Sequence, residues 1–294
     1  MDKIIVVNKP IGMTSHDVVN KIRRIFNTKR VGHTGTLDPD ASGVLVICLN
    51  EATKLVQFLE SDSKEYIAEI LIGRSTDTFD KTGNTILEVS VDNLTIEQVD
   101  NCLKTFVGKS SQIPPIYSAI KVNGKKLYEY ARNNEIIELT PRNIEIYSIE
   151  RISDLVKTEK FYYFKIKTHV SKGTYIRSLC VDIAKSLGYP GLMNCLERTK
   201  SGVWTIENSY SLTDIENGNY ESFTMLETLK NYPFVSDEDC VNKALHGMKI
   251  SPSKIEEILG EKPLRIIIAR DYKLIAIYDF DEEIYGYRAV RVWN

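Results

Sequence analysis

Residues 31–43 read Val31-Gly32-His33-Thr34-Gly35-Thr36-Leu37-Asp38-Pro39-Asp40-Ala41-Ser42-Gly43, which combines three glycines, three hydroxyl residues and two carboxylates. The stretch lies between a helical pattern with a basic end and an apolar run, residues 44–49, that predicts a buried strand. Pro39 biases Asp38 away from helical geometry, because the residue before a proline favours extended backbone. We therefore predict a stiff loop that presents the Asp38 carboxylate, and loops held against a rigid scaffold often carry chemistry.

Three alternatives compete with a catalytic interpretation of this loop. A phosphate-cradling loop needs the spacing Gly-x-x-x-x-Gly-Lys-Ser/Thr, and no lysine follows Gly35 or Gly43. A phosphotransfer pair of Asp38 and Asp40 would be expected at the end of an apolar strand, whereas this pair follows Gly-Thr-Leu. An Asx turn, in which Asp38 bonds only its own backbone, fits the composition about equally well. His33 is likewise compatible with a surface histidine that has no ligand.

Length and composition are those of an ordinary globular protein, and 294 residues allow one large domain plus a small one. The apolar run at residues 4–7 is too short for a signal peptide or a membrane span, so we expect a cytoplasmic protein without a membrane partner. Five cysteines without a Cys-x-x-Cys pair argue against a disulfide framework, and the four histidines show no zinc spacing. No metal site is predicted.

The net charge of −2 gives no sign of nucleic acid, but its distribution does. Residues 1–30 carry seven Lys/Arg against two acids, and residues 161–180 carry four Lys/Arg and no acid. A near-neutral protein binds phosphate backbones when its cations share one face. Solvated surfaces are the simpler alternative, and charge alone does not choose between them.

Periodicity predicts alternating strands and helices over most of the chain. Strands are predicted at 3–8, 44–49, 64–73, 143–152, 160–170 and about 196–204, and helices at 53–59, at 175–187 and after the capping boxes that begin at Thr14 and Thr95. Arg177 falls in the first turn of the helix over 175–187, where the helix dipole disfavours a cation. This placement indicates an anionic partner for Arg177; an arginine directed into water is the alternative.

Residues 112–127 combine an extended segment with a hairpin signal. Two prolines follow Gln112, and Asn123-Gly124 separates predicted strands over 117–122 and 125–127. Lysines and tyrosines interleave over residues 117–130, which suits contact with unstacked bases and phosphates, although an ordinary amphipathic hairpin and helix are equally compatible. These residues are Tyr117, Lys121, Lys125, Lys126, Tyr128 and Tyr130.

The pattern of predicted elements changes near the carboxyl end. A helical pattern covers 222–229, a helix is predicted over 237–245, and short strands are predicted at 264–269, 273–278 and 285–292. We interpret the tail from about residue 232 as a small β-rich appendage.

Residues 32–45, Gly-His-Thr-Gly-Thr-Leu-Asp-Pro-x-Ala-Ser-Gly-Val-Leu, resemble the catalytic motif of the TruB family, the tRNA pseudouridine-55 synthases. The resemblance covers residues 3 to about 206. Further matches follow in family order: Lys9-Pro10-x-Gly12-Met13-Thr14-Ser15, Lys64-x-Tyr66, Arg74-Ser75-Thr76-Asp77-Thr78-x-Asp80, Gln112-Ile113-Pro114-Pro115-x-Tyr117-Ser118-Ala119-Ile120-Lys121, Lys172-Gly173-Thr174-Tyr175-Ile176-Arg177 and Leu196-x-Arg198-Thr199-x-Ser201-Gly202. Trp204 stands where the family has Phe, a change that should keep the packing.

The resemblance implies an α+β pseudouridine-synthase fold with a mixed, largely antiparallel central sheet and an active site in a cleft across it. Residues 1–232 would form the catalytic domain, with a thumb-like insertion at about 109–134 that closes on the T arm of tRNA. Residues 233–294 would form a small β-rich PUA-like RNA-binding domain. The chain would act as a monomer on tRNA, with no cofactor and no metal.

The implied reaction isomerises uridine 55 of the T loop by flipping the base out and exchanging a C–N for a C–C glycosidic bond. Asp38 would be the carboxylate that initiates cleavage; attack at C1′, addition at C6 of the base and a glycal route stay open. Arg177 would pair with Asp38 and hold it ionised. Tyr66 would stack on the flipped base and move the proton lost later.

The resemblance also implies residues around the substrate. His33 would occupy or brace the space that the base leaves in the T loop, and Leu196 would pack beside the uracil. Tyr175 belongs to the same expected substrate-binding set, and Lys9 and Asp80 would support the site.

Two alternatives to this enzyme remain. A non-catalytic tRNA-folding or RNA-binding module would use the same basic cleft, although it would not need Asp38. A pseudouridine synthase within a larger ribonucleoprotein would be expected to carry a longer, more basic tail, whereas residues 233–294 hold eleven acids against nine Lys/Arg.

Overall fold

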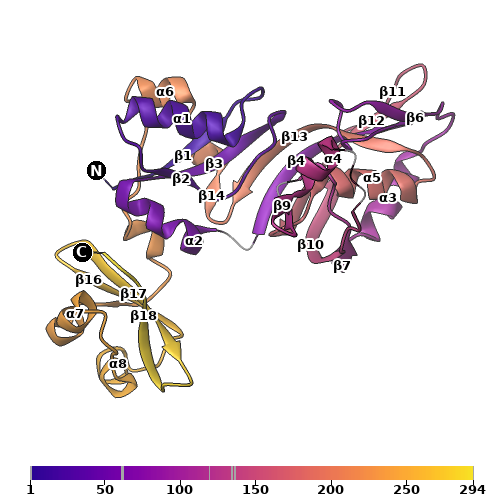
Figure 1. The fold of residues 1–294 in the computed structure, drawn as a ribbon. Helices are drawn as coiled ribbons and strands as arrows, with labels where there is room; N and C mark the ends of the chain where they lie inside the picture. Colours follow the sequence, from indigo (N-terminus) through magenta and orange to yellow (C-terminus); the bar gives the residue numbers. More distant parts are fainter. Residues whose placement is uncertain (1, 61–62, 119, 134, 136, 294) are drawn as a thin grey trace.

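The computed structural model describes residues 2–60, 63–118, 120–133, 135 and 137–293, and its largest unit is a ten-stranded sheet (Figure 1). β13 runs parallel to β3, and the other pairings along the sheet are antiparallel, which confirms the predicted α+β class with a mixed, largely antiparallel sheet. The order along the sheet is β1 (Ile4–Lys9), β3 (Ala41–Leu49), β13 (Gly191–Ser201), β4 (Ser63–Ile72), β12 (Tyr162–Ser171), β10 (Arg142–Arg151) and β7 (Gly108–Gln112), with β2 (Val31–His33) on β3, β14 (Trp204–Thr205) on β13 and β11 (Val156–Lys157) on β12.

Both faces of the sheet are covered near β1 and β3, which explains their continuous apolar sequences. Ile5 and Val7 pack with α1 (Ser15–Ile25), whereas Ile4 and Val6 pack into a second cluster on the opposite face. Successive side chains of a strand point to opposite faces, so a strand buried on both sides reads as an unbroken apolar run.

Capping boxes begin two of the predicted helices. Thr14 caps α1 and Thr95 caps α3 (Ile96–Lys104), each by exchanging hydrogen bonds with the residue three positions on. α3 and α5 (Ile176–Ser186) pack on the half of the sheet that carries β4, β12 and β10. A 3-10 helix, Asn50–Leu55, leads into the single turn α2 (Val56–Leu59), where one helix over 53–59 was predicted. A two-stranded ladder, β5 (Arg74–Thr76) with β6 (Thr85–Glu88), follows β4.

The hairpin predicted over 117–127 is shorter than expected. β8 (Lys121–Val122) pairs with β9 (Lys125–Lys126) across Asn123 and Gly124, which both have positive φ, and α4 (Leu127–Arg132) follows directly. The strand predicted from Tyr117 is wrong, because that carbonyl is turned toward Arg177 and the next amide bonds within a tight turn. Ala119 lies outside the described residues.

A separate four-stranded sheet forms the carboxyl-terminal part, below the amino-terminal half of the first sheet in Figure 1. Its order is β15 (Phe234–Val235), β16 (Arg265–Arg270), β17 (Lys273–Asp281) and β18 (Gly286–Val292), with α7 (Glu238–Leu245) and α8 (Pro252–Leu259) beside it. The predicted β-rich tail is confirmed, and α8 was not anticipated. Trp293 and residues of β16 and β17 complete an apolar cluster with Ile4 and Val6, so the two sheets share part of their core.

The helix predicted over 222–229 is wrong. Phe223 bonds to Ile4 in both directions, at 2.8 and 2.9 Å, which holds that segment extended beside β1 and leaves a short 3-10 turn at Glu227–Leu229. A different short helix, α6 (Leu212–Glu216), begins at a capping box on Ser211. None of the helices in the described part of the chain is both long enough and apolar enough to cross a bilayer.

Candidate active site

Asp38 lies on the loop between β2 and β3, and buried polar side chains hold that loop on both sides of it. Lys9 Nζ donates to the carbonyls of Pro10, Met13 and Pro39 at 2.9, 2.6 and 3.2 Å. Ser15 Oγ donates to the Leu37 carbonyl at 3.1 Å and accepts from the Leu37 amide at 2.9 Å. The backbone around Asp38 is therefore fixed before any substrate binds.

Arg198, on β13, holds the glycine-rich half of the same loop. Its Nε donates to the Val44 carbonyl at 2.7 Å, and its two Nη atoms donate to Thr36 and Gly35 carbonyls at 3.4 and 3.2 Å. The side chain is 1 % exposed. A guanidinium presents five donors in a rigid fork, which suits three carbonyls at different positions.

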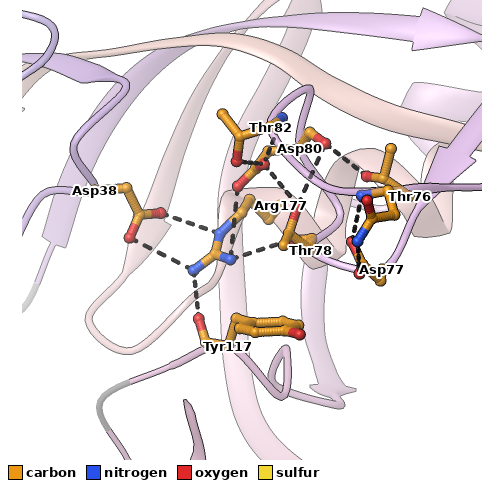
Figure 2. Close-up of polar contacts among 9 residues, drawn as sticks. Asp38, Thr76, Asp77, Thr78, Asp80, Thr82, Tyr117 and Arg177 are labelled. Atoms are coloured by element: carbon orange, nitrogen blue, oxygen red, sulfur yellow. Dashed lines mark hydrogen bonds and ion pairs between the residues drawn. The ribbon is translucent and has the colours of Figure 1, made fainter. Parts of the chain in front are cut away.

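The Asp38 carboxylate faces Arg177, 139 residues away in the sequence (Figure 2). Arg177 Nε lies 3.0 Å from Asp38 Oδ2, and Nη2 lies 3.5 Å from Oδ1. The side chain of Arg177 is 7 % exposed and that of Asp38 is 40 % exposed, so the pair sits at the edge between interior and solvent. This contact favours a functional carboxylate over the Asx turn, because both carboxylate oxygens face a partner from a distant element.

The Arg177 guanidinium is fixed by two further segments, one that contains Thr78 and Asp80 and one that contains Tyr117. Nη1 donates to the Thr78 carbonyl at 3.1 Å and lies 3.8 Å from Asp80 Oδ2, and Nη2 donates to the Tyr117 carbonyl at 2.9 Å. The anionic partner expected for a cation in the first turn of α5 is therefore present. Arg177 thus contacts three further oxygens, the Thr78 and Tyr117 carbonyls and Asp80 Oδ2, besides the Asp38 carboxylate.

Asp80 supports Arg177 from behind. Its Oδ1 accepts from Thr78 Oγ1, Thr82 N and Thr82 Oγ1 at 2.7, 3.0 and 2.6 Å, as Figure 2 shows. Its backbone carbonyl accepts from Thr76 Oγ1 at 2.6 Å. Asp80 thus positions the guanidinium and does not line the cavity beside Asp38.

Burial raises the pKa of Asp38 above its usual value, and the nearby carboxylates of Asp80 and Asp40 raise it further. Arg177 and Lys9 act in the opposite direction and lower that pKa, but burial is the largest effect. Arg177 therefore favours the ionised form without fully offsetting the cost of burial. The pKa of Lys9 is itself lowered, chiefly by burial.

A cavity of about 390 Å³ opens beside the pair. Asp38, Arg177, Tyr66, Tyr175 and Leu196 all line it. Strand register explains the convergence: Tyr66 on β4 lies opposite Arg198 on β13, two residues from Leu196, and alternate residues of paired strands share a face. Burial raises the pKa of Tyr66, and the neighbouring Arg198 partly opposes this effect.

The remaining predicted residues are not all at the cavity. The Gln112 side chain forms two hydrogen bonds with the Tyr175 backbone: Oε1 accepts from the amide at 2.8 Å, and Nε2 donates to the carbonyl at 3.1 Å. Lys9 is fully buried and lies outside the cavity wall that the described residues form, where its Nζ holds the loop that carries Asp38. His33 accepts from the Gly35 amide at 3.3 Å, its pKa is lowered by burial, and it lies outside the cavity wall that the described residues form.

Sequence reasoning gave no role to Arg198 or Gln112. Arg198 matched a family motif, and its position two residues after Leu196 on a predicted strand places it on the same inward face. The alternation of inward and outward side chains along this strand could have indicated that Arg198 faces the site. The described residues contain no group of three or more His, Cys, Asp or Glu side chains arranged to hold a metal ion.

The fold is that of a pseudouridine synthase. A solved structure described as "Crystal Structure of a Cbf5-Nop10-Gar1 Complex" matches with a TM-score of 0.69 and 26% identity, covering 99% of this chain and 84% of that one. The model of the TruB family pseudouridylate synthase (N terminal domain) matches residues 23–176.

Similar proteins agree over most of the chain. A protein named tRNA pseudouridine synthase B from Oceanobacillus iheyensis is 43% identical over 95% of this chain and 92% of its own length. One of the same name from Caldanaerobacter subterraneus is 46% identical over 85% of this chain and 86% of its own length. The chain belongs to the TruB family of pseudouridylate synthases, which are isomerases.

Proposed function

We propose that this chain isomerises uridine 55 in the T loop of tRNA to pseudouridine. The observation that supports this proposal most directly is the position of the Asp38 carboxylate. It lies at the wall of a cavity, and the buried Arg177 guanidinium contacts both of its oxygens. The name of its relatives, tRNA pseudouridine synthase B, supports tRNA as the RNA on which it acts.

The reaction rearranges one nucleotide. The bond between C1′ and N1 breaks, the uracil turns, a bond forms between C1′ and C5, the C5 hydrogen leaves as a proton, and N1 takes up a proton, so that substrate and product are isomers. No electron acceptor and no water are consumed. A base inside a folded loop cannot reach the cavity, so the target nucleotide is flipped out at a cost of a few kcal/mol.

Asp38 initiates the cleavage in this proposal, whether by attack at C1′, by addition at C6 or through a glycal route. Each route needs the carboxylate ionised, and Arg177 favours that form while orienting both oxygens. Tyr66 and Leu196 line the same cavity, where Tyr66 would stack on the flipped uracil and Leu196 would pack beside it. Stacking on an aromatic ring contributes about 1–3 kcal/mol per base.

The RNA outside the cavity needs further contacts. We propose that residues of about 109–134 act as a thumb on the T arm, where Lys125 is exposed. We propose that residues 1–232 form the catalytic domain and that the second sheet, within 233–294, is a PUA-like RNA-binding domain. His33 would brace the T loop once the base has left, and Tyr175 would contact the substrate in the cavity.

One chain supplies every residue of the proposed site, so we expect a monomer to be active, and a tRNA substrate supports the proposed location in the cytoplasm. Both statements can be checked directly. Size-exclusion chromatography of the active protein would report its oligomeric state, and fractionation would report its location.

The decisive experiment uses a tRNA transcript with tritium at C5 of uridine. Wild-type protein should release tritium, and Asp38→Asn, which keeps the shape and removes the charge, should lower the rate by more than about a thousandfold because it removes the reacting group. Binding of the transcript should be retained, because Asp38 would repel phosphates. Tritium release by Asp38→Asn at the wild-type rate would reject the role of Asp38.

The same assay separates the alternative of a non-catalytic RNA-binding module, which would bind the transcript and release no tritium. Mass spectrometry of tRNA from a strain that lacks the gene would map the missing pseudouridine. Loss at a position other than 55 would overturn the proposed site specificity while leaving the enzymatic activity in place.

A further inference from the structure

A buried hydroxyl at the cavity has no protein partner among the residues that the structure describes. Ser118 is 6 % exposed, and its Oγ is buried without a hydrogen bond. Its backbone is satisfied, because its amide donates to the Ile116 carbonyl at 3.0 Å and its carbonyl accepts from the Tyr128 amide at 3.2 Å. The side chain alone is therefore left with unused hydrogen-bonding capacity, which is costly in an interior.

The position of this hydroxyl is unusual. Five buried side-chain atoms in the described part of the chain lack a partner, and Ser118 Oγ is the one that belongs to a residue lining the proposed active-site cavity. The others are Arg23 Nε, Arg74 Nε, Thr199 Oγ1 and Ser201 Oγ. Unpaired polar groups that persist at a cavity are candidates for contact with a ligand.

Ser118 is also close to the reacting carboxylate. It directly follows Tyr117, whose carbonyl accepts from the same Arg177 nitrogen that faces Asp38 Oδ1. A base whose C1′ lies at Asp38 would come near Ser118 at its glycosidic edge, and the Ser118 hydroxyl would reach it by turning about its Cα–Cβ bond toward the cavity, because Oγ itself is buried in the structure. In uridine, the carbonyl beside the glycosidic nitrogen is C2=O, and in pseudouridine the carbonyl beside the glycosidic carbon is C4=O. A single hydroxyl can therefore donate to a carbonyl at one position before and after the base turns.

We propose that Ser118 Oγ donates a hydrogen bond to the uracil carbonyl that flanks the glycosidic bond, and so positions the flipped base. This inference rests on the proposed function and adds a substrate-binding residue to it. It also accounts for the unpaired hydroxyl: the group keeps its capacity for a substrate atom.

The test combines Ser118→Ala with a change of one substrate atom. A T-arm stem-loop RNA is prepared with uridine or 2-thiouridine at the target, because sulfur is a poorer acceptor than oxygen, and product is measured by nucleoside chromatography. Ser118→Ala should lower kcat/KM about tenfold on uridine, with most of the effect in KM. On 2-thiouridine the same substitution should cost less than about twofold, since the bond is already weakened.

A thermal melt excludes a merely structural role. Ser118→Ala removes a buried, unpaired hydroxyl, so its Tm should equal or exceed that of wild type while its activity falls. Ser201→Ala is the matched control: its hydroxyl is equally buried and unpaired, the residue is 1 % exposed, and it does not line the cavity. Its kcat/KM should stay within about twofold of wild type.

The outcomes are distinguishable. If wild type forms no pseudouridine from the uridine stem-loop, the proposed function fails. If wild type is active but Ser118→Ala is within twofold of it, or if the effects of Ser118→Ala and the thio substitution simply multiply, the inference about Ser118 is wrong and the proposed function stands.

Discussion

At the scale of single residues, the site is decided by opposing effects on one carboxylate. Burial, Asp80 and Asp40 raise the pKa of Asp38, whereas Arg177 and Lys9 lower it. An acid whose pKa is raised in this way loses its charge at a higher pH than an ordinary Asp as the solution is acidified. Since the proposed reaction needs the ionised form, the acid limb of the pH–rate profile should report these neighbours.

Asp80→Asn should move that acid limb. The amide oxygen of Asn can still accept from Thr78 and Thr82, but the negative charge that raises the pKa of Asp38 is gone. The pKa of Asp38 should fall, so activity should persist to lower pH, with the midpoint of the acid limb displaced downward by less than about one unit. The measurement is kcat/KM for tritium release against pH.

Asp77→Asn is the control for this shift. Asp77 lies in the same loop and accepts from Asn84 at 2.8 and 3.1 Å, and it does not contribute to the pKa of Asp38. The acid limb of the pH–rate profile of Asp77→Asn should coincide with that of wild type. An upward displacement for Asp80→Asn, or equal displacements for both variants, would contradict the assigned electrostatics.

Sequence patterns identified Asp38 and Arg177 for physical reasons that survive in the structure. Asp38 precedes a proline in a glycine-rich loop, and Arg177 stands where a helix dipole disfavours it, so each was conspicuous locally. Arg198 was not conspicuous in the sequence, because a lysine or arginine on a strand ordinarily points to solvent. Its burial depends on the pairing of β13 with β3, which no local pattern states.

At the scale of elements, the parallel contact between β3 and β13 joins the loop that carries Asp38 to the cavity wall. Gly43 makes this contact possible: its φ is 105°, and a Cβ there would lie 2.2 Å from the Arg198 carbonyl oxygen. Backbone atoms cannot move aside as a flexible side chain can. The two strands approach closely because this position carries no side chain.

Gly43→Ala should therefore destabilise the protein by more than about 3 kcal/mol, from strain and clash together. The free energy of unfolding in urea is the measurement. Gly188→Ala is the matched control, since Gly188 also has a positive φ, of 87°, but a Cβ there would meet open space. Gly188→Ala should lower the free energy of unfolding by about 1 kcal/mol. Similar costs for both variants would show that the close approach does not matter.

Local signals predicted some elements well and failed at others. The capping boxes at Thr14 and Thr95 begin α1 and α3 because their hydrogen bonds form within four residues. The apolar pattern over 222–229 was helical by periodicity, yet Phe223 is bound to Ile4, more than two hundred residues earlier. Long-range pairing overrides local preference when it satisfies more of the backbone.

At the scale of the whole molecule, the two sheets are tied by a shared apolar cluster. Trp293 is 6 % exposed, lies in the cluster that includes Ile4 and Val6, and donates from Nε1 to the Glu51 carbonyl at 3.2 Å. Arg265 lies over the rings of Phe58 and Tyr232, at 5.1 and 5.4 Å from their centres. The carboxyl-terminal sheet is therefore fixed against the first by packing as well as by the chain.

Trp293→Ala should uncouple the two sheets. Removing a buried Trp costs about 3–5 kcal/mol, and here the loss falls on the contact between them. Differential scanning calorimetry should show one transition for wild type and two for the variant, because the second sheet would melt first. Tyr272→Ala, at a side chain that is 98 % exposed, should leave the curve unchanged. One unshifted transition for Trp293→Ala would show that the shared cluster does not couple the sheets.

The contact between the Tyr117 carbonyl and Arg177 links the segment at 109–134 to Asp38. This carbonyl belongs to the segment expected to grip RNA, yet it shares one guanidinium nitrogen with the Asp38 carboxylate. When a ligand shifts that segment, it changes how much of the positive charge Asp38 receives, and thermodynamic linkage makes the effect reciprocal. With the proposed roles of this segment and of Asp38, RNA binding and protonation of Asp38 would therefore be coupled through Arg177.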